Sequence, residues 1–330
     1  MSSVAFVLLA FMLGAYVLLD GFDLGIATIA PFVGKDEEER GAAMRAIGPF
    51  WNGNEVWLIA AGGALFALFP KAYASAFSGF YLPFVVVLWL LMFRGIAIEL
   101  RGHFATPMWR DFWDFCFSGS SALLVVLFGV ALGNLLRGVP LDADGYFTGS
   151  FGFLLNPYAL LVGLTALAAI AMHGAAFALL RTEGPPADRA RKALPALAGA
   201  TAAGFVATTV YTLAIHGFTA PWVAVFPATA IGALIVVLRA ARAGNGGRAF
   251  LASSALLASL FGAAAATLYP HLLTAFPGPG GIDISSAAPS PAALASALAV
   301  VLVGVVAVCI YGSIVLVPIF RQKVGTKLKP

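Results

Sequence analysis

Nine long apolar runs dominate the sequence, and each is long enough to cross a lipid bilayer as a helix, which takes about 20 residues. They cover approximately residues 4–33, 50–69, 76–100, 113–136, 155–180, 194–215, 221–239, 249–269 and 291–320. Because lipid offers no partners for backbone N–H and C=O groups, helices are expected. The Val- and Ile-rich runs are too long and too uniformly apolar for barrel strands. The sequence therefore predicts an all-α polytopic membrane protein, with residues 1–330 forming one integral-membrane domain.

The composition agrees with a chain that has lipid as its solvent. Hydrophobic residues make up 61% of the 330 residues and charged residues only 10%, whereas a soluble domain carries about 25% charged residues. The net charge of +4 does not indicate a nucleic-acid partner, because the basic residues form short clusters between the apolar runs. Such clusters are typical of topology signals.

The positive charges predict the orientation of the chain. Sixteen of the 19 Lys and Arg residues follow the odd-numbered runs: Lys35, Arg40, Arg45, Arg101, Arg110, Arg181, Arg189, Arg191, Lys192, Arg239, Arg242, Arg248, Arg321, Lys323, Lys327 and Lys329. The alternate loops hold only Lys71 and Arg137. Since positive charge marks the cytoplasmic side, the N-terminus is predicted outside and the C-terminus in the cytoplasm. One helix more or fewer would break this alternation.

The lengths of the outer links suggest how the helices are grouped. The links near 70–75 and 216–220 are short enough for hairpins, whereas those at 137–154 and 270–290 are long and rich in Gly, Pro, Asp and Ser. This spacing predicts two four-helix units followed by a ninth helix. The first run lacks the basic region and cleavage site of a signal peptide, so it is expected to stay as a helix.

Ionisable residues in the apolar runs are the candidates for function, since each costs roughly 2.5–3.5 kcal/mol at the centre of a membrane helix. Asp20 and Asp23 share one face of the first helix, and Asn52 and Glu55 share one face of the second. The two helices run in opposite directions, so Asp23 and Glu55 are expected at similar depth in the cytoplasmic half. Such carboxyls predict either a hydrated proton path or a salt-bridge cluster.

Arg94 lies inside the third run, about two turns from its cytoplasmic end. A guanidinium at this depth is expected to pair with an acid such as Glu55 or Asp23, or with an anionic group of a partner chain. In the first run, Gly21 and Gly25 form a small-xxx-small pair that favours close approach of another helix. Trp57 is either an interface anchor or part of the polar region.

The histidines and cysteines do not predict a cofactor site in this chain. No two of the four histidines have the spacing of a bis-ligand pair, and His173 is expected to be a buried, hydrogen-bonded imidazole. Cys116 and Cys309 are far apart and are expected to be free thiols. We therefore expect no catalytic group, no metal site and no bound cofactor in this chain by itself.

Ordered motifs resemble the second subunit of cytochrome bd-type ubiquinol oxidases. They are Leu19-Asp20-Gly21-Phe22-Asp23-Leu24-Gly25, Trp51 to Trp57 with 61–67, Phe77-Ser78-Gly79-Phe80-Tyr81, Phe93-Arg94-Gly95, Glu99-Leu100-Arg101, 133–140, Leu155-Asn156-Pro157 and Arg321-Gln322-Lys323-Val324. The resemblance implies a haem-free subunit in the bacterial inner membrane, which packs against a first subunit that carries haems b and d and the quinol site. The complex would oxidise quinol and reduce dioxygen to water with protons from the cytoplasm. The resemblance also leaves room for a structural quinone or lipid and for small accessory membrane subunits.

The resemblance also implies roles for individual residues. The family places a proton route at the positions of Asp20, Asp23 and Asn52. We add Glu55 to this route because of its expected depth. The family places an oxygen route or the subunit contact at the positions of Trp57 and Arg94. Many relatives have Asp at the Asn52 position, and an amide cannot carry a proton. Either Glu55 carries the proton in place of residue 52, or the proton route needs only a polar residue that holds water at that position. An ion-coupled secondary transporter is the alternative, although the sequence lacks the paired broken helices typical of that class.

Overall fold

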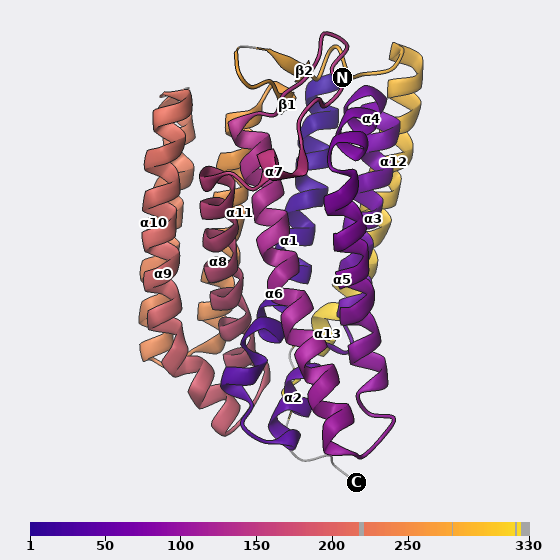
Figure 1. Cartoon of the computed structure of the whole chain (residues 1–330). Coiled ribbons are helices and arrows are strands. Elements are labelled where there is room, and N and C mark those ends of the chain that lie inside the picture. Colours follow the sequence, from indigo (N-terminus) through magenta and orange to yellow (C-terminus); the bar gives the residue numbers. More distant parts are fainter. Residues whose placement is uncertain (218–220, 279, 321, 325–330) are drawn as a thin grey trace.

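The computed structural model describes residues 1–217, 221–278, 280–320 and 322–324, and it is a bundle of long helices (Figure 1). The long helices are α1 (Ser2–Val33), α3 (Trp51–Leu68), α5 (Tyr81–Leu100), α6 (Pro107–Arg137), α8 (Pro157–Arg181), α9 (Pro185–His216), α10 (Val225–Arg242), α11 (Gly246–Leu268) and α12 (Pro291–Tyr311). The all-α membrane class is thus confirmed. Arg321, Lys327 and Lys329, which the orientation argument uses, lie outside the described residues.

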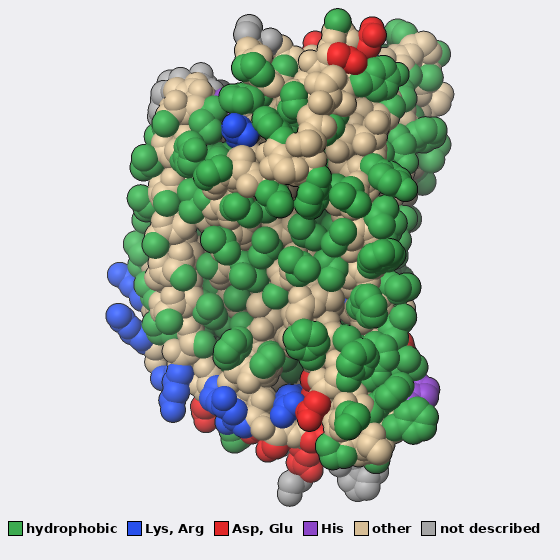
Figure 2. Space-filling view, viewed as in Figure 1, with side chains coloured by type: hydrophobic (Ala, Val, Ile, Leu, Met, Phe, Trp, Pro, Cys, Tyr) green, Lys and Arg blue, Asp and Glu red, His purple; other side chains and the backbone are tan. Residues whose placement is uncertain are grey.

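Eight of the described helices are long and apolar enough to cross a membrane, and α3 is not among them. The reason lies in its first turns, which carry Asn52, Asn54 and Glu55 and lower the hydropathy of the whole helix. The count of nine spans and the orientation therefore stay predictions. Figure 2 shows a broad apolar belt, with most of the Lys and Arg side chains gathered toward the end where α2 (Glu37–Ile47) lies, as a membrane protein with asymmetric charge requires.

Short helices modify the predicted links. Residues 37–47 form α2, whose Asp36 side chain caps the helix by accepting from the Glu39 N–H, and whose residues Ala42, Ala43, Met44, Ala46 and Ile47 are buried. The predicted hairpin at 70–75 is wrong, because Pro70 starts α4 (Pro70–Gly79) and the predicted run 76–100 is divided between α4 and α5. A single turn, α7 (Phe151–Leu154), precedes α8.

The two long outer links meet at one end of the bundle. Strands β1 (His271–Thr274) and β2 (Gly281–Asp283) form a small antiparallel hairpin, and Val139 pairs beside it with Ala275. Gly138 has a φ of 99° and would place a Cβ 2.8 Å from the Ala275 carbonyl oxygen, so this close contact requires glycine. The hairpin is an addition to the all-α prediction, outside the long helices.

Helix α1 occupies the middle of the bundle and packs on α3, α6 and α8 (Figure 1). Its closest approach is to α8, where a Cβ on Gly25 would lie 2.2 Å from the Ile170 carbonyl oxygen. The expectation that Gly21 and Gly25 allow close helix packing is confirmed most directly at Gly25. One buried apolar cluster joins residues from α1, α8 and α11, so the predicted grouping into two four-helix units stays a prediction.

The described C-terminal residues return to the bundle. After a π-helical turn (Gly312–Leu316), α13 (Val317–Phe320) brings Phe320 against Phe22 and Phe50, with ring centroids 5.4 and 4.7 Å away. Arg181 donates to the Ile319 carbonyl at 2.6 Å, and Val324 donates to the Arg181 carbonyl at 2.7 Å. These contacts fix the polar end of α8 to the C-terminal segment.

Candidate functional site: a buried acid–arginine cluster

Arg94 lies at the centre of a charged cluster inside the bundle. Its Nη2 is 2.6 Å from Asp20 Oδ1 and its Nη1 is 3.1 Å from Asp20 Oδ2, so the guanidinium binds both carboxylate oxygens. Nη1 also donates to Glu55 at 2.8 Å. Asp20 and Arg94 have no exposed side-chain surface, whereas 21% of the Glu55 side chain is exposed. Glu55 is therefore the member of the cluster that opens to the exterior of the chain.

Asp23 is the third acid of the cluster and is held by an amide. Asn54 Nδ2 donates to Asp23 Oδ2 at 2.7 Å and to the Leu19 carbonyl at 3.1 Å, while the nearest Arg94 nitrogen is 4.0 Å from Asp23. The other Asp23 oxygen is buried and has no hydrogen-bond partner among the residues that the structure describes. Asp23 is thus held mainly by Asn54, and its contact with Arg94 is longer than those of Asp20 and Glu55.

The helices bring these residues together in a simple way. Asp20 and Asp23 are three residues apart on α1, and the buried positions of α3 are Asn54, Trp57, Ala61, Ala64 and Leu68. This spacing of three and four places Asn54 on the face of α3 that packs on α1. Arg94 comes from α5 with Val87 and Ala97, its other buried positions. The cluster therefore joins three helices.

The structure brings together most of the predicted site residues. Arg94 pairs with Glu55, as expected, but its principal partner is Asp20, which the sequence argument did not select. Asn52 is exposed on α3, and the amide at the carboxylates is Asn54, which sequence reasoning missed. Trp57 is buried with its ring 6.0 Å from that of Phe11, in an edge arrangement. The buried stripe of α3 is the signal that separates Asn54 from Asn52.

A large apolar cavity begins one turn from the cluster. It has a volume of about 580 Å³ and is lined by side chains of α1, α6, α8, α9 and α11, including Leu13, Phe128 and Phe261. Tyr16 lies between the two features: it lines the cavity and is one helical turn before Asp20. Its hydroxyl is buried, with no hydrogen-bond partner in the described part of the chain. Thr165, Thr208 and Thr212 add a narrow polar strip to the wall.

His173 does not offer an open ligand to a haem. Its Nε2 donates to the Leu18 carbonyl at 3.1 Å, its Nδ1 lies 2.7 Å from the Ser253 hydroxyl, and its ring stacks on Phe250 at 4.8 Å. The expected buried, hydrogen-bonded imidazole is confirmed. Within the described ranges, no group of three or more His, Cys, Asp or Glu residues is placed to hold a metal ion.

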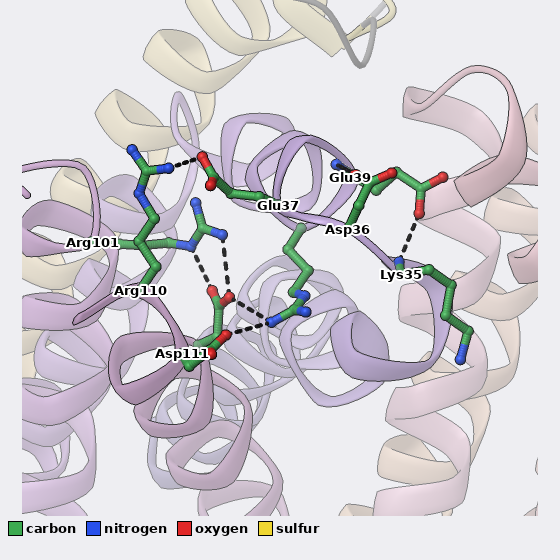
Figure 3. A network of polar contacts seen from close by, with 9 residues as sticks. Lys35, Asp36, Glu37, Glu39, Arg101, Arg110 and Asp111 are labelled. Carbon is green, nitrogen blue, oxygen red and sulfur yellow. Dashed lines mark hydrogen bonds and ion pairs between the residues drawn. The ribbon is translucent and has the colours of Figure 1, made fainter. Parts of the chain in front are cut away.

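A second charged network lies at the α2 end of the bundle (Figure 3). Arg40 binds Asp111 at 3.1 Å and Asp114 at 3.2 Å, and Arg101 binds Asp114 at 2.5 Å. Further ion pairs join Glu37 to Arg110 and Glu39 to Arg189. The hydrogen bond from Arg189 lowers the pKa of Glu39 below its usual value. This network ties α2 to the starts of α6 and α9.

A comparison with protein families gives one match over most of the chain. The model for cytochrome bd terminal oxidase subunit II matches residues 1–317. The structure is also similar to one described as the structure of bd oxidase from Geobacillus thermodenitrificans, with a TM-score of 0.80 over 97% of this chain and 98% of the other. At 18% sequence identity, that likeness concerns the fold.

Curated relatives agree with the family match. A probable cytochrome oxidase subunit 2 from Haemophilus influenzae is 33% identical over 81% of this chain and 80% of the relative. The cytochrome bd-I ubiquinol oxidase subunit 2 of Escherichia coli K12 is 41% identical over 54% of this chain and 48% of its own length, and the cytochrome bd ubiquinol oxidase subunit 2 of Bacillus subtilis is 41% identical over 57% and 55%. None of these comparisons supports the transporter alternative. The chain therefore belongs to the cytochrome bd terminal oxidase subunit II family.

Proposed function

We propose that this chain is the haem-free subunit of a quinol oxidase in the bacterial inner membrane. It would pack against a first subunit that carries haems b and d, and the complex would oxidise quinol and reduce dioxygen to water. The family match over residues 1–317 and the relatives named as ubiquinol oxidase subunits support this assignment. Small accessory membrane subunits are compatible with it. The chain contributes structure and polar groups, and it is not catalytic alone.

Within the complex, the acid–arginine cluster is proposed to conduct protons from the cytoplasm. The observation that carries this proposal is the graded exposure of the cluster: Asp20 and Asp23 are fully buried, whereas Glu55 is 21% exposed. Asn52, exposed three residues before Glu55 on α3, would hold water at the approach to that opening. Protons would pass from Glu55 toward the two aspartates.

The number of charges also favours proton traffic over a static salt bridge. Three carboxyl groups surround one guanidinium, so Arg94 cannot neutralise all of them. Buried charges need a partner or a proton. A cluster with more acids than bases can bind and release a proton while the Arg94–Asp20 pair stays intact, which a proton route requires.

Trp57 and Arg94 remain candidates for an oxygen route or the subunit contact. Both side chains are buried inside this chain, Trp57 against Phe11 and Arg94 against Asp20. An internal role therefore suits Trp57 better than direct contact with a partner. Arg94 would reach a partner only through Glu55, the exposed acid that it binds.

The cavity of about 580 Å³ is proposed to hold the tail of a structural quinone or lipid. Its walls are almost entirely apolar, as an isoprenoid or acyl chain requires, and the buried Tyr16 hydroxyl supplies a donor for a carbonyl oxygen. In this proposal the occupant has a structural role, because it fills the apolar space between α1, α6, α8, α9 and α11.

The proton proposal is tested with the double variant Asp23→Asn, Glu55→Gln in the purified complex. Both changes keep size and hydrogen bonding but remove the ability to titrate. We expect quinol-driven oxygen consumption to fall about a hundredfold, the low end of the effect of a positioned proton-transfer group, while haem content stays at the parent level. Asp144→Asn, in an exposed outer loop, is the matched control. Parent-like turnover of the double variant with full haem content would exclude the cluster from the proton route.

A further inference from the structure

A second cavity, of about 530 Å³, lies at the α2 end of the bundle between α1, α2 and α6. We propose that it binds one phospholipid with a zwitterionic headgroup, that is, a phosphate joined to a primary ammonium. The phosphate would lie at Lys35 and Arg40, the ammonium at Asp111, and the start of one acyl chain against the apolar wall. This site is separate from the acid–arginine cluster and from the larger apolar cavity.

The position of the cavity is that of a lipid headgroup. It begins at Ala30 and Pro31 in the last turn of α1, where the apolar run ends, and reaches Lys35 and Arg40, where the charged start of α2 follows. Helix α2 buries its apolar face against the bundle, and the exposed Glu37 and Glu38 in its first turn face water. One wall of the cavity thus faces hydrocarbon and the other faces water.

The apolar part of the cavity continues onto an exposed surface. Met44 and Phe117 form its inner wall, and Phe115, which is 75% exposed, forms its outer edge. Phe32, which follows the lining residue Pro31 in α1, is 71% exposed. Large apolar side chains with this exposure, next to a groove, need an apolar occupant. An acyl chain that leaves the cavity along Phe115 would contact the apolar inner wall and would also cover the exposed apolar edge.

The charged part of the cavity contains both signs. Arg40 uses Nη1 for Asp111 and Asp114, which leaves its other N–H groups as donors. Asp111 is 68% exposed on its side chain, so it keeps acceptor capacity toward an ammonium. Figure 3 shows Lys35 joining the network only through its backbone N–H, which donates to Glu39, while its side chain extends away. Among the described residues, no acid pairs with the Lys35 ammonium.

This charge pattern favours a zwitterionic headgroup over an anionic one. The four ionic residues that line the cavity, Lys35, Arg40, Asp111 and Asp114, have no net charge together. A headgroup with only negative charge would gain from Lys35 but would be repelled by Asp111, the exposed acid of the lining, whereas Asp114 is already paired with Arg40 and Arg101. A primary ammonium reverses that repulsion and donates hydrogen bonds to the exposed carboxylate.

The test measures lipid retained by the purified oxidase complex that contains this chain, by native mass spectrometry after exchange with synthetic lipids. The probes are phosphatidylethanolamine and phosphatidylglycerol with the same acyl chains. We expect phosphatidylethanolamine to be retained preferentially, and Lys35→Gln and Asp111→Asn each to weaken its retention about three- to fivefold, as for partly exposed ion pairs. Lys71→Gln and Asp144→Asn, at the opposite end of the bundle, are the matched controls and should leave retention unchanged.

Each outcome decides the proposal. Asp111→Asn should also improve phosphatidylglycerol relative to phosphatidylethanolamine, because it removes a repelling charge. Equal retention of the two lipids, preference for phosphatidylglycerol, or a loss confined to Lys35→Gln would overturn the zwitterionic site. The readout is bound lipid and not turnover, so the result is independent of the proton proposal. Thermal unfolding of each variant complex, expected to match the parent, shows that the fold is retained.

Discussion

Arg94 binds both carboxylate oxygens of Asp20, with Nη2 2.6 Å from Oδ1 and Nη1 3.1 Å from Oδ2, and neither side chain is exposed. The two residues come from α5 and α1 and are 74 residues apart in the chain, so this pair links two helices that are distant in sequence. A planar fork that fits a carboxylate is a property of arginine and not of lysine. The geometry therefore makes the identity of the cation important, and not only its charge.

The first prediction concerns Arg94. Arg94→Ala leaves Asp20 as a buried charge without its partner, and removal of one partner from a buried pair costs about 3–5 kcal/mol. Arg94→Lys keeps the charge and loses the fork, so its effect should be smaller. We expect complex yield and oxygen consumption to decrease in the order parent, lysine, alanine. Parent-like values for both variants would mean that the pair has no role in assembly or turnover.

The second prediction separates the two asparagines of α3. Asn54→Ala removes the donor to Asp23 and Leu19 and should destabilise the complex by about 1–3 kcal/mol, the cost of leaving buried acceptors unpaired. Asn52→Ala, at an exposed position, should stay within about 0.5 kcal/mol of the parent. Asn52→Asp should also be tolerated. Thermal unfolding of the three variant complexes checks the order, which would be reversed if Asn52 were the amide that orients Asp23.

Most of the fold could be predicted because membrane solvation acts on every residue of a long run. Apolar length alone identifies the helices, and each of the eight qualifying helices overlaps one of those runs, although α6 (Pro107–Arg137) and α9 (Pro185–His216) begin before the runs 113–136 and 194–215. The short elements were missed for a different reason. Helix α2 has a mean apolar content too low for a span, and it forms because Asp36 caps it and Ala42 and Ile47 bury against the bundle. That tertiary burial is not encoded in a hydropathy window.

The site was predictable in composition and less so in pairing. The cost of burying charge selects Asp20, Asp23, Glu55 and Arg94 from the sequence, and all four meet in the structure. Which acid Arg94 binds depends on the rotation of α5 relative to α1, and depth alone does not determine that rotation. The same limitation explains why Asn52 was selected: its spacing from Glu55 is correct, but the face of α3 toward α1 is set by Asn54, Trp57 and Ala61.

The third prediction tests the contact between α1 and α8. A Cβ on Gly25 would lie 2.2 Å from the Ile170 carbonyl oxygen and 2.7 Å from the Gly174 nitrogen, and both are backbone atoms that cannot move alone. Gly25→Ala should therefore separate the helices and cost more than the typical 1–3 kcal/mol of an overpacked core. Gly199→Ala, on an exposed face of α9 with nothing within 4 Å of the added Cβ, is the control and should be neutral or stabilising. Equal complex yield for the two variants would contradict the close helix contact.

The fourth prediction is a pH dependence at the α2 end. The hydrogen bond from Arg189 lowers the pKa of Glu39, and the Glu39 side chain is only 9% exposed. A carboxyl whose pKa is lower in the folded state binds fewer protons there than in the unfolded chain, so it stabilises the fold above its unfolded pKa of about 4.3. That contribution is lost as the pH falls through the folded pKa, because the protonated acid no longer accepts from Arg189.

The melting temperature of the Glu39→Gln complex should thus be a few degrees below the parent near neutral pH, and the difference should shrink in acid below about pH 4.3. Glu38→Gln, which removes an exposed carboxyl from the same turn of α2, is the matched control. A Glu39→Gln difference that stays constant from neutral pH into acid would show that the loss comes from packing and not from the ion pair.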